Sequence, residues 1–215
     1  MEKTERYHKL FISLRYWLLG MSEQNAEWRM PLNALEYAKT LHTGLRKDGA
    51  TPEFQHQLEI AHYLRTLYRG LLFPAQTMAA ALLHDVPEDY DISYQEIEGL
   101  CGKMVAADVE LLTKKHMGMK KTTETYFTEM ANSPRASVIK GADRINNHQT
   151  MHGAFSLEKQ ASYLHETQEF ILPMLKNARR LHPEQEPIYE NIKFVLNAQI
   201  ELVSIRLNEA KKLTR

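Results

Sequence analysis

Apolar side chains recur at steps of three and four along most of this chain, which is the spacing of one face of an α-helix. We find no convincing run in which apolar and polar residues alternate, as they would in a half-buried β-strand. The pattern therefore predicts an all-α fold. The first helix is expected to end near Gly20, and its apolar stripe consists of Tyr7, Leu10, Phe11, Leu14, Trp17 and Leu18.

Prolines and one capping motif mark where several helices should begin or break. Pro31 and Pro74 each lie at an expected helix start. Ser93, with Glu96 three residues later, forms a capping box that begins another helix. We expect Pro173 to kink or divide the helix in which it lies. Further helices are expected over residues 103–116, 122–131, 135–150, 157–180 and 187–212.

Composition limits the protein class. At 215 residues the chain is long enough for one domain with a substantial buried core. Its 27 Lys+Arg balance 27 Asp+Glu, which argues against a dedicated nucleic-acid or anionic-membrane binder. Cys101 is the only cysteine, so a multi-cysteine zinc site is excluded and a reducing cytoplasm is the expected location. The polar start does not resemble a signal peptide, and no apolar run is long enough to span a membrane.

The last expected helix carries a regular apolar seam. This seam could pack on the core of its own domain, or it could form part of a homodimer interface. Its length is below three full heptads, which does not decide between the two. The seam consists of Tyr189, Ile192, Leu196, Ile200, Val203 and Leu207, and it is widened on one side by Ile188, Val195 and Leu202.

The segment HDVPED places four ionisable side chains at the end of an apolar helix. His84 and Asp85 are adjacent, about 100° apart around a helix, so both can reach one metal ion. Pro87 disfavours helical geometry at the residue before it, so we expect Glu88 and Asp89 to lie in a turn beside the metal. Without a cation these charges would repel one another. The alternative interpretation is an acidic surface turn.

Two further residues complete a set of metal ligands. His56 opens the helix after a turn-rich loop, and Asp143 follows Gly141 and Ala142, which are small enough to let helices approach closely. Together with the His-Asp pair, they supply two nitrogen donors and at least two oxygen donors. Such a mixed set suits Mn²⁺ or Zn²⁺. It also leaves coordination positions open for water and substrate, as hydrolysis requires.

These residues resemble the H…HD…D pattern of HD-domain metal-dependent phosphohydrolases. The flanking blocks AKTLHTGLRKDGATPEFQH, AALLHDVPED, LLTKK and IKGADRINN look like those of the hydrolase domain of RelA/SpoT homologues, over roughly residues 31–175. Small single-domain alarmone hydrolases have the most similar architecture, because no synthetase or regulatory region follows. The resemblance implies one HD-type helical bundle over residues 1–215, with helical extensions at 1–30 and 187–215.

The resemblance also implies roles for individual residues. Glu88 and Asp89 match the acidic pair that orients and deprotonates the attacking water. Mn²⁺ is usual in the family, although Zn²⁺ or another divalent metal would suit the same donors. The metal ligands are matched by His56, His84, Asp85 and Asp143. The substrate-binding positions are matched by Arg46, Lys47, Thr113, Lys114, Arg144 and Asn147.

The implied activity is hydrolysis of the 3′-pyrophosphate of ppGpp and pppGpp, which gives GDP or GTP and pyrophosphate. The metal would polarise a phosphoryl oxygen and lower the pKa of bound water, and a carboxylate would act as general base. Arg46 and Lys47 would neutralise charge on the pyrophosphate. The expected partner is a small-molecule nucleotide, not a nucleic acid or a membrane.

Several departures from the family pattern leave the substrate open. Glu53 and Gln57 stand where the family often has Tyr and Pro, and Pro87 and Gly141 replace residues that are often apolar. None of these changes removes a ligand. The same machinery could nevertheless remove phosphate from NADPH or another nucleotide. A third hypothesis is a non-catalytic nucleotide-binding or antitoxin-like protein, against which the presence of every metal and acid position argues.

Other residues near these motifs are expected to lie around the site without binding the metal ion. We interpret His42 as a structural residue beside the ligands, and His148 and His152 as exposed or at the rim of the pocket. Met117 and Met119, on either side of a glycine, indicate a mobile loop between helices.

Overall fold

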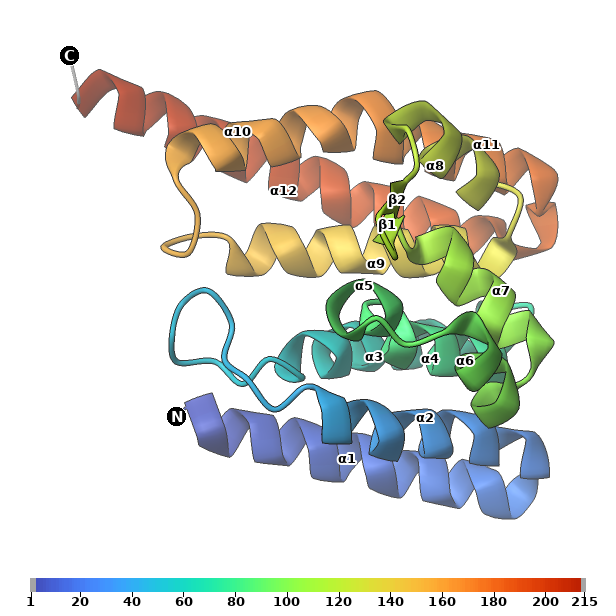
Figure 1. The fold of residues 1–215 in the computed structure, drawn as a ribbon. Coiled ribbons are helices and arrows are strands. Elements are labelled where there is room, and N and C mark those ends of the chain that lie inside the picture. Colours follow the sequence, from blue (N-terminus) through green and yellow to red (C-terminus); the bar gives the residue numbers. More distant parts are fainter. Residues whose placement is uncertain (1–2, 214–215) are drawn as a thin grey trace.

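The computed structural model describes residues 3–213, which fold into a helical bundle with one small hairpin (Figure 1). The predicted all-α class is confirmed. The helices are α1 (Lys3–Gln24), α2 (Arg29–Leu41), α3 (Gln55–Leu67), α4 (Pro74–Leu83), α5 (Val86–Tyr90), α6 (Tyr94–Cys101), α7 (Lys103–Leu112), α8 (Thr123–Met130), α9 (Pro134–Thr150), α10 (Leu157–Glu166), α11 (Leu172–Leu181) and α12 (Glu186–Leu213).

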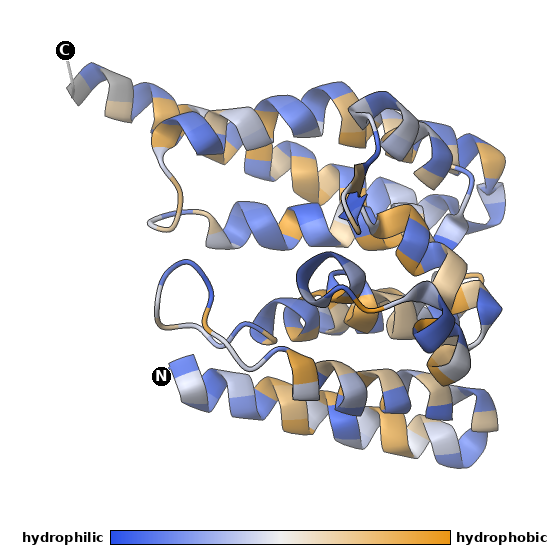
Figure 2. Ribbon diagram, in the orientation of Figure 1, coloured by the Kyte–Doolittle hydropathy of each residue, from blue (hydrophilic) through white to orange (hydrophobic). Residues whose placement is uncertain are grey.

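Helix α4 lies at the centre of the bundle. Every residue from Ala75 to Leu83 is buried, because α4 packs against α2, α3, α7 and α9. A helix that is apolar all round is stable only when it is surrounded in this way. Most other helices carry one orange and one blue side in Figure 2, as amphipathic helices on a shared core should. The carboxyl end of α4 therefore delivers the residues that follow it into the interior.

Most predicted helix starts are confirmed, but two predicted ends are wrong. The Ser93 side chain caps α6 by accepting from the backbone N–H of Glu96, as the motif predicts. Helix α1 continues through Gly20 to Gln24. The helix expected over residues 103–116 ends at Leu112, and the following residues form a hairpin of β1 (Lys115–His116) and β2 (Met119–Lys120).

The hairpin turn explains why the chain leaves the helix there. Met117 and Gly118 have φ values of 48° and 81°, so both central residues are in the left-handed region. Two consecutive residues of this kind form a type I′ turn, the two-residue loop that commonly joins the strands of a β-hairpin. The expected loop is therefore an ordered turn between short strands.

Pro173 divides the helix over residues 157–180, as expected. Residues Thr167–Ile171 form a π-helical turn between α10 and α11, and Pro173 is in the first turn of α11. Proline has no N–H to donate to the preceding turn, so the regular α-helical ladder cannot pass through it. The extra residue of a π-turn changes which side chains face the bundle.

Both terminal helices pack on the main core. Phe11, Leu14 and Leu18 of α1 join the same buried cluster as Tyr189 and other seam residues of α12. The six residues of the seam are all buried within the chain, although Leu202 at its edge is 68% exposed. The interpretation of the seam as part of the chain's own core is thus the correct one. Within residues 3–213, no helix combines the length and apolar character needed to cross a membrane.

Candidate metal centre and substrate cleft

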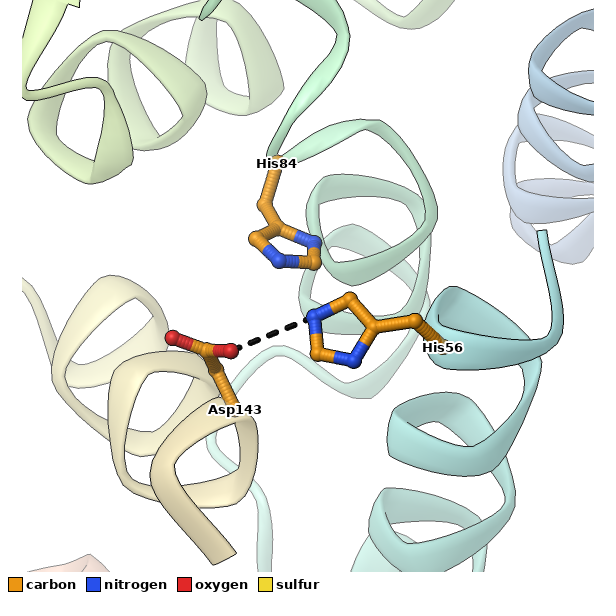
Figure 3. A group of neighbouring side chains, drawn as sticks. All are labelled: His56, His84 and Asp143. Carbon is orange, nitrogen blue, oxygen red and sulfur yellow. Dashed lines mark ion pairs between the residues drawn. The ribbon is translucent and has the colours of Figure 1, made fainter. Parts of the chain in front are cut away.

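Three helices deliver the buried centre of the candidate site (Figure 3). His56 lies in the first turn of α3, His84 directly follows α4, and Asp143 lies in the middle of α9. All three side chains are buried, and one donor atom of each lies within 4.8 Å of the others. Donor atoms from separate helices that converge in this way form a group that could hold a metal ion.

The fourth predicted ligand, Asp85, borders this group. Its Oδ2 lies 3.1 Å from Nε2 of His84 and 3.7 Å from Nε2 of His56. On the other side, Nε2 of His56 lies 3.2 Å from Oδ1 of Asp143. The structure therefore brings all four predicted ligands together, with both ε nitrogens directed at carboxylates.

Hydrogen bonds behind the imidazoles set their orientation. Nδ1 of His84 donates to the carbonyl of Ala81 at 2.8 Å, so the δ nitrogen carries a proton. Nδ1 of His56 lies 2.7 Å from Oδ1 of Asn146, whose amide group donates to Glu59 at 2.7 Å. Both Nε2 atoms are thus presented to the centre, and Nε2 of His84 is buried without a hydrogen bond. Metal-binding histidines are oriented by such partners, so the donor set fits a divalent cation.

The charges at the centre are strongly coupled. Burial alone would lower the pKa of His84, but the carboxylates of Asp85 and Asp143 outweigh it and raise the pKa to about 9. Burial alone would raise the pKa of Asp143, but Lys140 and His56 hold it well below its usual range. Buried carboxylates need positive charge beside them. Protonated imidazole or a bound cation can supply it.

The acidic pair lies at the mouth of the centre, on α5. Glu88 and Asp89 are exposed and line a cleft, and they belong to a short helix instead of the predicted turn. Pro87 is tolerated because it occupies the first turn of α5, where no N–H is needed. Although Asp89 reaches solvent, the walls of the cleft partly desolvate its carboxyl group, and this desolvation, together with the carboxylates of Asp85, Glu53 and Glu88, raises its pKa to about 6. A carboxylate with such a pKa suits a general base near neutral pH.

A second group of potential ligands lies beside the acidic pair. His42, Glu53 and Asp89 have donor atoms within 4.8 Å of one another. The Tyr90 hydroxyl donates to Glu53 at 2.8 Å and lies 3.1 Å from Nδ1 of His42, and the imidazole stacks on Phe54. These contacts explain the arrangement without a cation. They support the structural interpretation of His42 and turn Glu53 toward a hydroxyl.

A cleft of about 1550 Å³ opens over the centre, and most predicted substrate-binding residues line it. Thr113 does not, because it is buried and its hydroxyl donates to the Val109 carbonyl at 2.8 Å. Asn147 lines the cleft but donates to Oδ1 of Asp143 at 2.6 Å, so it also orients a candidate ligand. The predicted residues that line the cleft are Arg46, Lys47, Lys114, Arg144 and Asn147.

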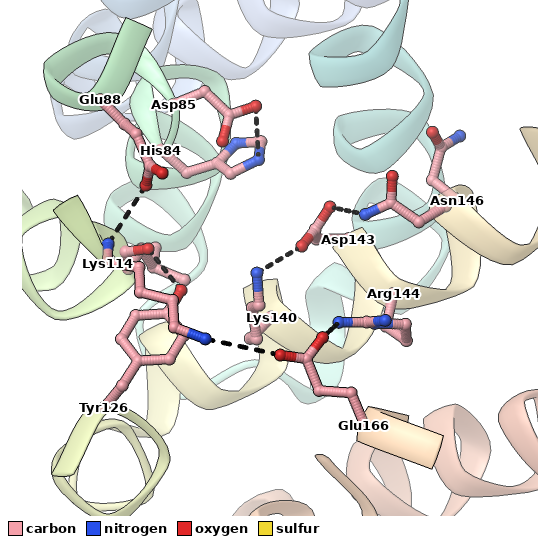
Figure 4. A network of polar contacts seen from close by, with 12 residues as sticks. His84, Asp85, Glu88, Lys114, Tyr126, Lys140, Asp143, Arg144, Asn146 and Glu166 are labelled. Atoms are coloured by element: carbon pink, nitrogen blue, oxygen red, sulfur yellow. Dashed lines mark hydrogen bonds and ion pairs between the residues drawn. The ribbon is translucent and has the colours of Figure 1, made fainter. Parts of the chain in front are cut away.

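A network of charges in the cleft wall was not foreseen from the sequence (Figure 4). Nζ of Lys140 lies 2.7 Å from Oδ2 of Asp143, and Glu166 pairs with Arg144 and, at 3.6 Å, with Lys114. The position of Lys140, three residues before Asp143 on one helix, is a signal that could have identified this pair. Glu166 could not be found in this way, because its partners come from other elements.

The other two histidines differ from each other. His152 is exposed at the rim of the cleft, as predicted. The prediction for His148 is wrong, because α9 turns it into the core, where Nε2 lies 3.0 Å from the hydroxyl of Thr167.

Comparison with known families gives one match that covers most of the chain. A family described as HD domain matches residues 34–181. A probable guanosine-3′,5′-bis(diphosphate) 3′-pyrophosphohydrolase from Synechocystis sp. is 34% identical over 163 residues, which cover 72% of this chain and 21% of the relative. The bifunctional (p)ppGpp synthase/hydrolase SpoT of Escherichia coli K12 is 32% identical over 145 residues, 64% of this chain and 20% of that protein.

A solved structure is similar over a larger share of its own length. This structure, described as "A metazoan ortholog of SpoT hydrolyzes ppGpp and plays a role in starvation responses", superimposes with a TM-score of 0.59 at 26% sequence identity. The match covers 76% of this chain and 93% of that one. By contrast, the chain spans about a fifth of the length of the curated relatives that it matches.

Proposed function

This chain belongs to the HD domain family, and we propose that it hydrolyses the 3′-pyrophosphate of guanosine alarmones with the help of Mn²⁺. The substrates would be ppGpp and pppGpp, and the products GDP or GTP and pyrophosphate. The observation that carries the proposal is the convergence of His56, His84 and Asp143 beneath a large cleft lined by charged side chains. The names of the relatives point to the same reaction.

His56, His84, Asp85 and Asp143 would hold the metal ion. When bound, the ion would polarise a phosphoryl oxygen and lower the pKa of a coordinated water. The donor set contains no thiolate, and mixed imidazole and carboxylate ligands suit Mn²⁺ as well as Zn²⁺. Asn146, Ala81 and Asn147 would keep these ligands in place through the hydrogen bonds described above.

Asp89 is the proposed general base. It lines the cleft, and its pKa of about 6 leaves it largely ionised at neutral pH yet able to accept a proton. The water oxygen would attack the phosphorus bonded to the ribose 3′-oxygen, and the water proton would pass to Asp89. The bond between phosphorus and the 3′-oxygen would break, and the 3′-oxygen would take the proton that Asp89 received and become a hydroxyl. Glu88, fixed by the backbone N–H of Lys114 at 3.2 Å, would help to orient the water.

Cationic groups on the cleft wall would bind the phosphates. Arg46 and Lys47 lie on the loop between α2 and α3, and Lys114 precedes the hairpin. Charge-assisted hydrogen bonds from such groups are well suited to phosphate oxygens. Arg144 is held by Glu166, so we propose that it supports the pocket wall or exchanges this carboxylate for a phosphate.

Pyrophosphate release from ppGpp by the purified protein, with Mn²⁺ and then with excess EDTA, tests this function. We expect rapid release that EDTA abolishes. For Asp89→Asn, we expect kcat to fall by at least about 100-fold. His84→Ala should lose both turnover and the Mn²⁺ that remains bound after dialysis, whereas His8→Ala on the exposed face of α1 should retain both. Full metal-dependent turnover in His84→Ala would overturn the site. Preference for NADPH in a substrate panel would overturn the alarmone assignment.

We propose in addition that residues 1–215 act as one HD-type domain in the cytoplasm, with the extensions 1–30 and 187–215 completing the core. The burial of residues from α1 and α12 in one cluster supports this. A homodimer stays a prediction. Its interface would have to use a surface other than the α12 seam, which is buried within the chain.

A further inference from the structure

The hairpin beside the cleft carries an arrangement of lysines that is unfavourable on its own. Lys115 and Lys120 are direct partners across the antiparallel strands. The next pair, Lys114 and Lys121, is joined by a backbone hydrogen bond from the N–H of Lys121 at 3.0 Å. Because hydrogen-bonded and non-hydrogen-bonded pairs alternate, Lys115 and Lys120 form a non-hydrogen-bonded pair, in which side chains are closest. Like charges directly opposite each other destabilise a hairpin.

The four hairpin lysines differ in what balances their charge. Nζ of Lys114 lies 3.6 Å from Glu166, and Nζ of Lys121 lies 3.6 Å from Glu129. Within residues 3–213, no carboxylate forms an ion pair with Lys115 or Lys120, and both are exposed and line the cleft. The unbalanced pair is therefore exposed to the cleft in which the substrate is proposed to bind.

The base of the hairpin is fixed, so the backbone that carries Lys115 and Lys120 is held in position. The backbone N–H of Lys114 donates to Glu88, and the His116 ring lies 4.8 Å from that of Tyr94. Nζ of Lys121 donates to the carbonyl of Glu110 at 2.8 Å. Because this backbone is already ordered, only the lysine side chains lose conformational freedom when an anion binds, which favours binding.

Most other cations of the cleft are already neutralised. Each of the following has a carboxylate partner: Lys3, Arg6, Lys140 and Arg144. The unpaired positive charge is concentrated at two places, which are well separated in Figure 1. One is the loop with Arg46 and Lys47, and the other is the hairpin; Lys159 of α10 also lines the cleft.

We propose that Lys115 and Lys120 bind the 5′-phosphates of the nucleotide, while its 3′-pyrophosphate lies at the metal centre. This inference rests on the proposed function, because a substrate phosphorylated at both ends presents two separate clusters of negative charge. The loop would take the pyrophosphate that is released, and the hairpin would take the other cluster. The hairpin would thus make affinity depend on the number of 5′-phosphates.

Binding of the series pGpp, ppGpp and pppGpp, measured by equilibrium dialysis in EDTA, tests this proposal without turnover. For the wild type, Kd should fall along the series. Lys115→Gln/Lys120→Gln should raise Kd for pppGpp at least tenfold, equivalent to about 1.4 kcal/mol, and for pGpp less than threefold. Lys115→Arg/Lys120→Arg, which keeps both charges, should show the same fall of Kd along the series as the wild type. Lys103→Gln/Lys176→Gln removes the same charge from exposed positions outside the cleft and should change nothing.

Two outcomes would overturn the proposal. In the first, the Gln variant has the same Kd values as the wild type for all three nucleotides. In the second, Kd rises by the same factor for all three, which would indicate only a general loss of charge. Misfolding is checked by the melting temperature, which should not fall, because the substitution removes repulsion. Turnover with Mn²⁺ is measured in parallel. A wild type that binds the series as expected but hydrolyses none of it would disprove the proposed function and retain the role of the hairpin.

Discussion

Gly141 on α9 permits the close helix contact that positions Asp143. A Cβ at Gly141 would lie 2.7 Å from Cγ2 of Ile192 and 3.3 Å from Cδ2 of Leu175. Carbon atoms in contact are separated by about 3.5–4.0 Å, so Gly141→Ala must push α9 from α12 or move a buried side chain. Overpacking of this kind costs about 1–3 kcal/mol. Replacing a helical glycine by alanine otherwise contributes about 1 kcal/mol of stability. We expect a net loss of about 1 kcal/mol in the free energy of unfolding.

Gly20 provides a matched control for the same chemical change. It lies inside α1, and no atom lies within 4 Å of the position that its Cβ would occupy. Gly20→Ala should therefore stabilise the protein by about 0.5–1 kcal/mol. Urea unfolding followed by circular dichroism measures both variants. Equal stabilisation by the two substitutions would refute the close-contact argument, because helix propensity alone would then explain them.

A double-mutant cycle locates the clash. Ile192→Ala alone should cost about 2–5 kcal/mol, since it leaves a cavity. It should cost less in the Gly141→Ala background, where the new methyl group fills part of that space. Because Asp143 follows Gly141 by two residues on α9, Gly141→Ala should also weaken Mn²⁺ binding, measured as a higher dissociation constant. Additive effects of the two substitutions would show that they do not share a contact.

Three other predictions concern charge. Arg135→Met should destabilise the protein by about 3–5 kcal/mol in urea unfolding, because it leaves the Asp108 carboxylate, which is 1% exposed, without its ion pair. A loss below 1 kcal/mol would contradict this. Burial, together with the charge of Arg144, lowers the pKa of His148 from 6.5 to about 4. The unfolded state then binds this proton more readily, so the stabilisation is fully present above pH 6.5 and is lost as the pH falls toward 4. His148→Gln should flatten the fall in stability between pH 7 and pH 4 by about 3 kcal/mol, and an unchanged pH profile would disprove the assignment. Mn²⁺ at 100 times its Kd should stabilise the wild type by about 2.7 kcal/mol but not His84→Ala, and equal stabilisation of both would count against the site.

The centre could be anticipated because its signals are local. The HDVPED segment follows the most apolar helix of the chain, so the burial of His84 is implied by the sequence of α4 itself. The position of Pro173 likewise predicts a break in a long helix, although not that the break is a π-turn.

The features that were missed depend on contacts between distant segments. Asn146 and Glu59 orient His56 from two other places in the sequence, and neither belongs to a motif. The sequence does not predict the hairpin, because its strands have only two residues each and because its turn places Met117 at positive φ, where Asn or Asp is usual. The sequence places His148 at the rim because the helix pattern does not show that the π-turn covers that face of α9.

The candidate ligands are divided between the two halves of the chain. His56 and His84 come from the amino-terminal helices, and Asp143 comes from α9 in the carboxyl-terminal half. An ion held by all three would act as a cross-link between segments that lie far apart in the sequence. Since only the folded chain presents these donors together, loss of the ion would increase the unfolded fraction that proteases attack. The supply of the metal in the cell would then set how long each molecule survives as well as how fast it works.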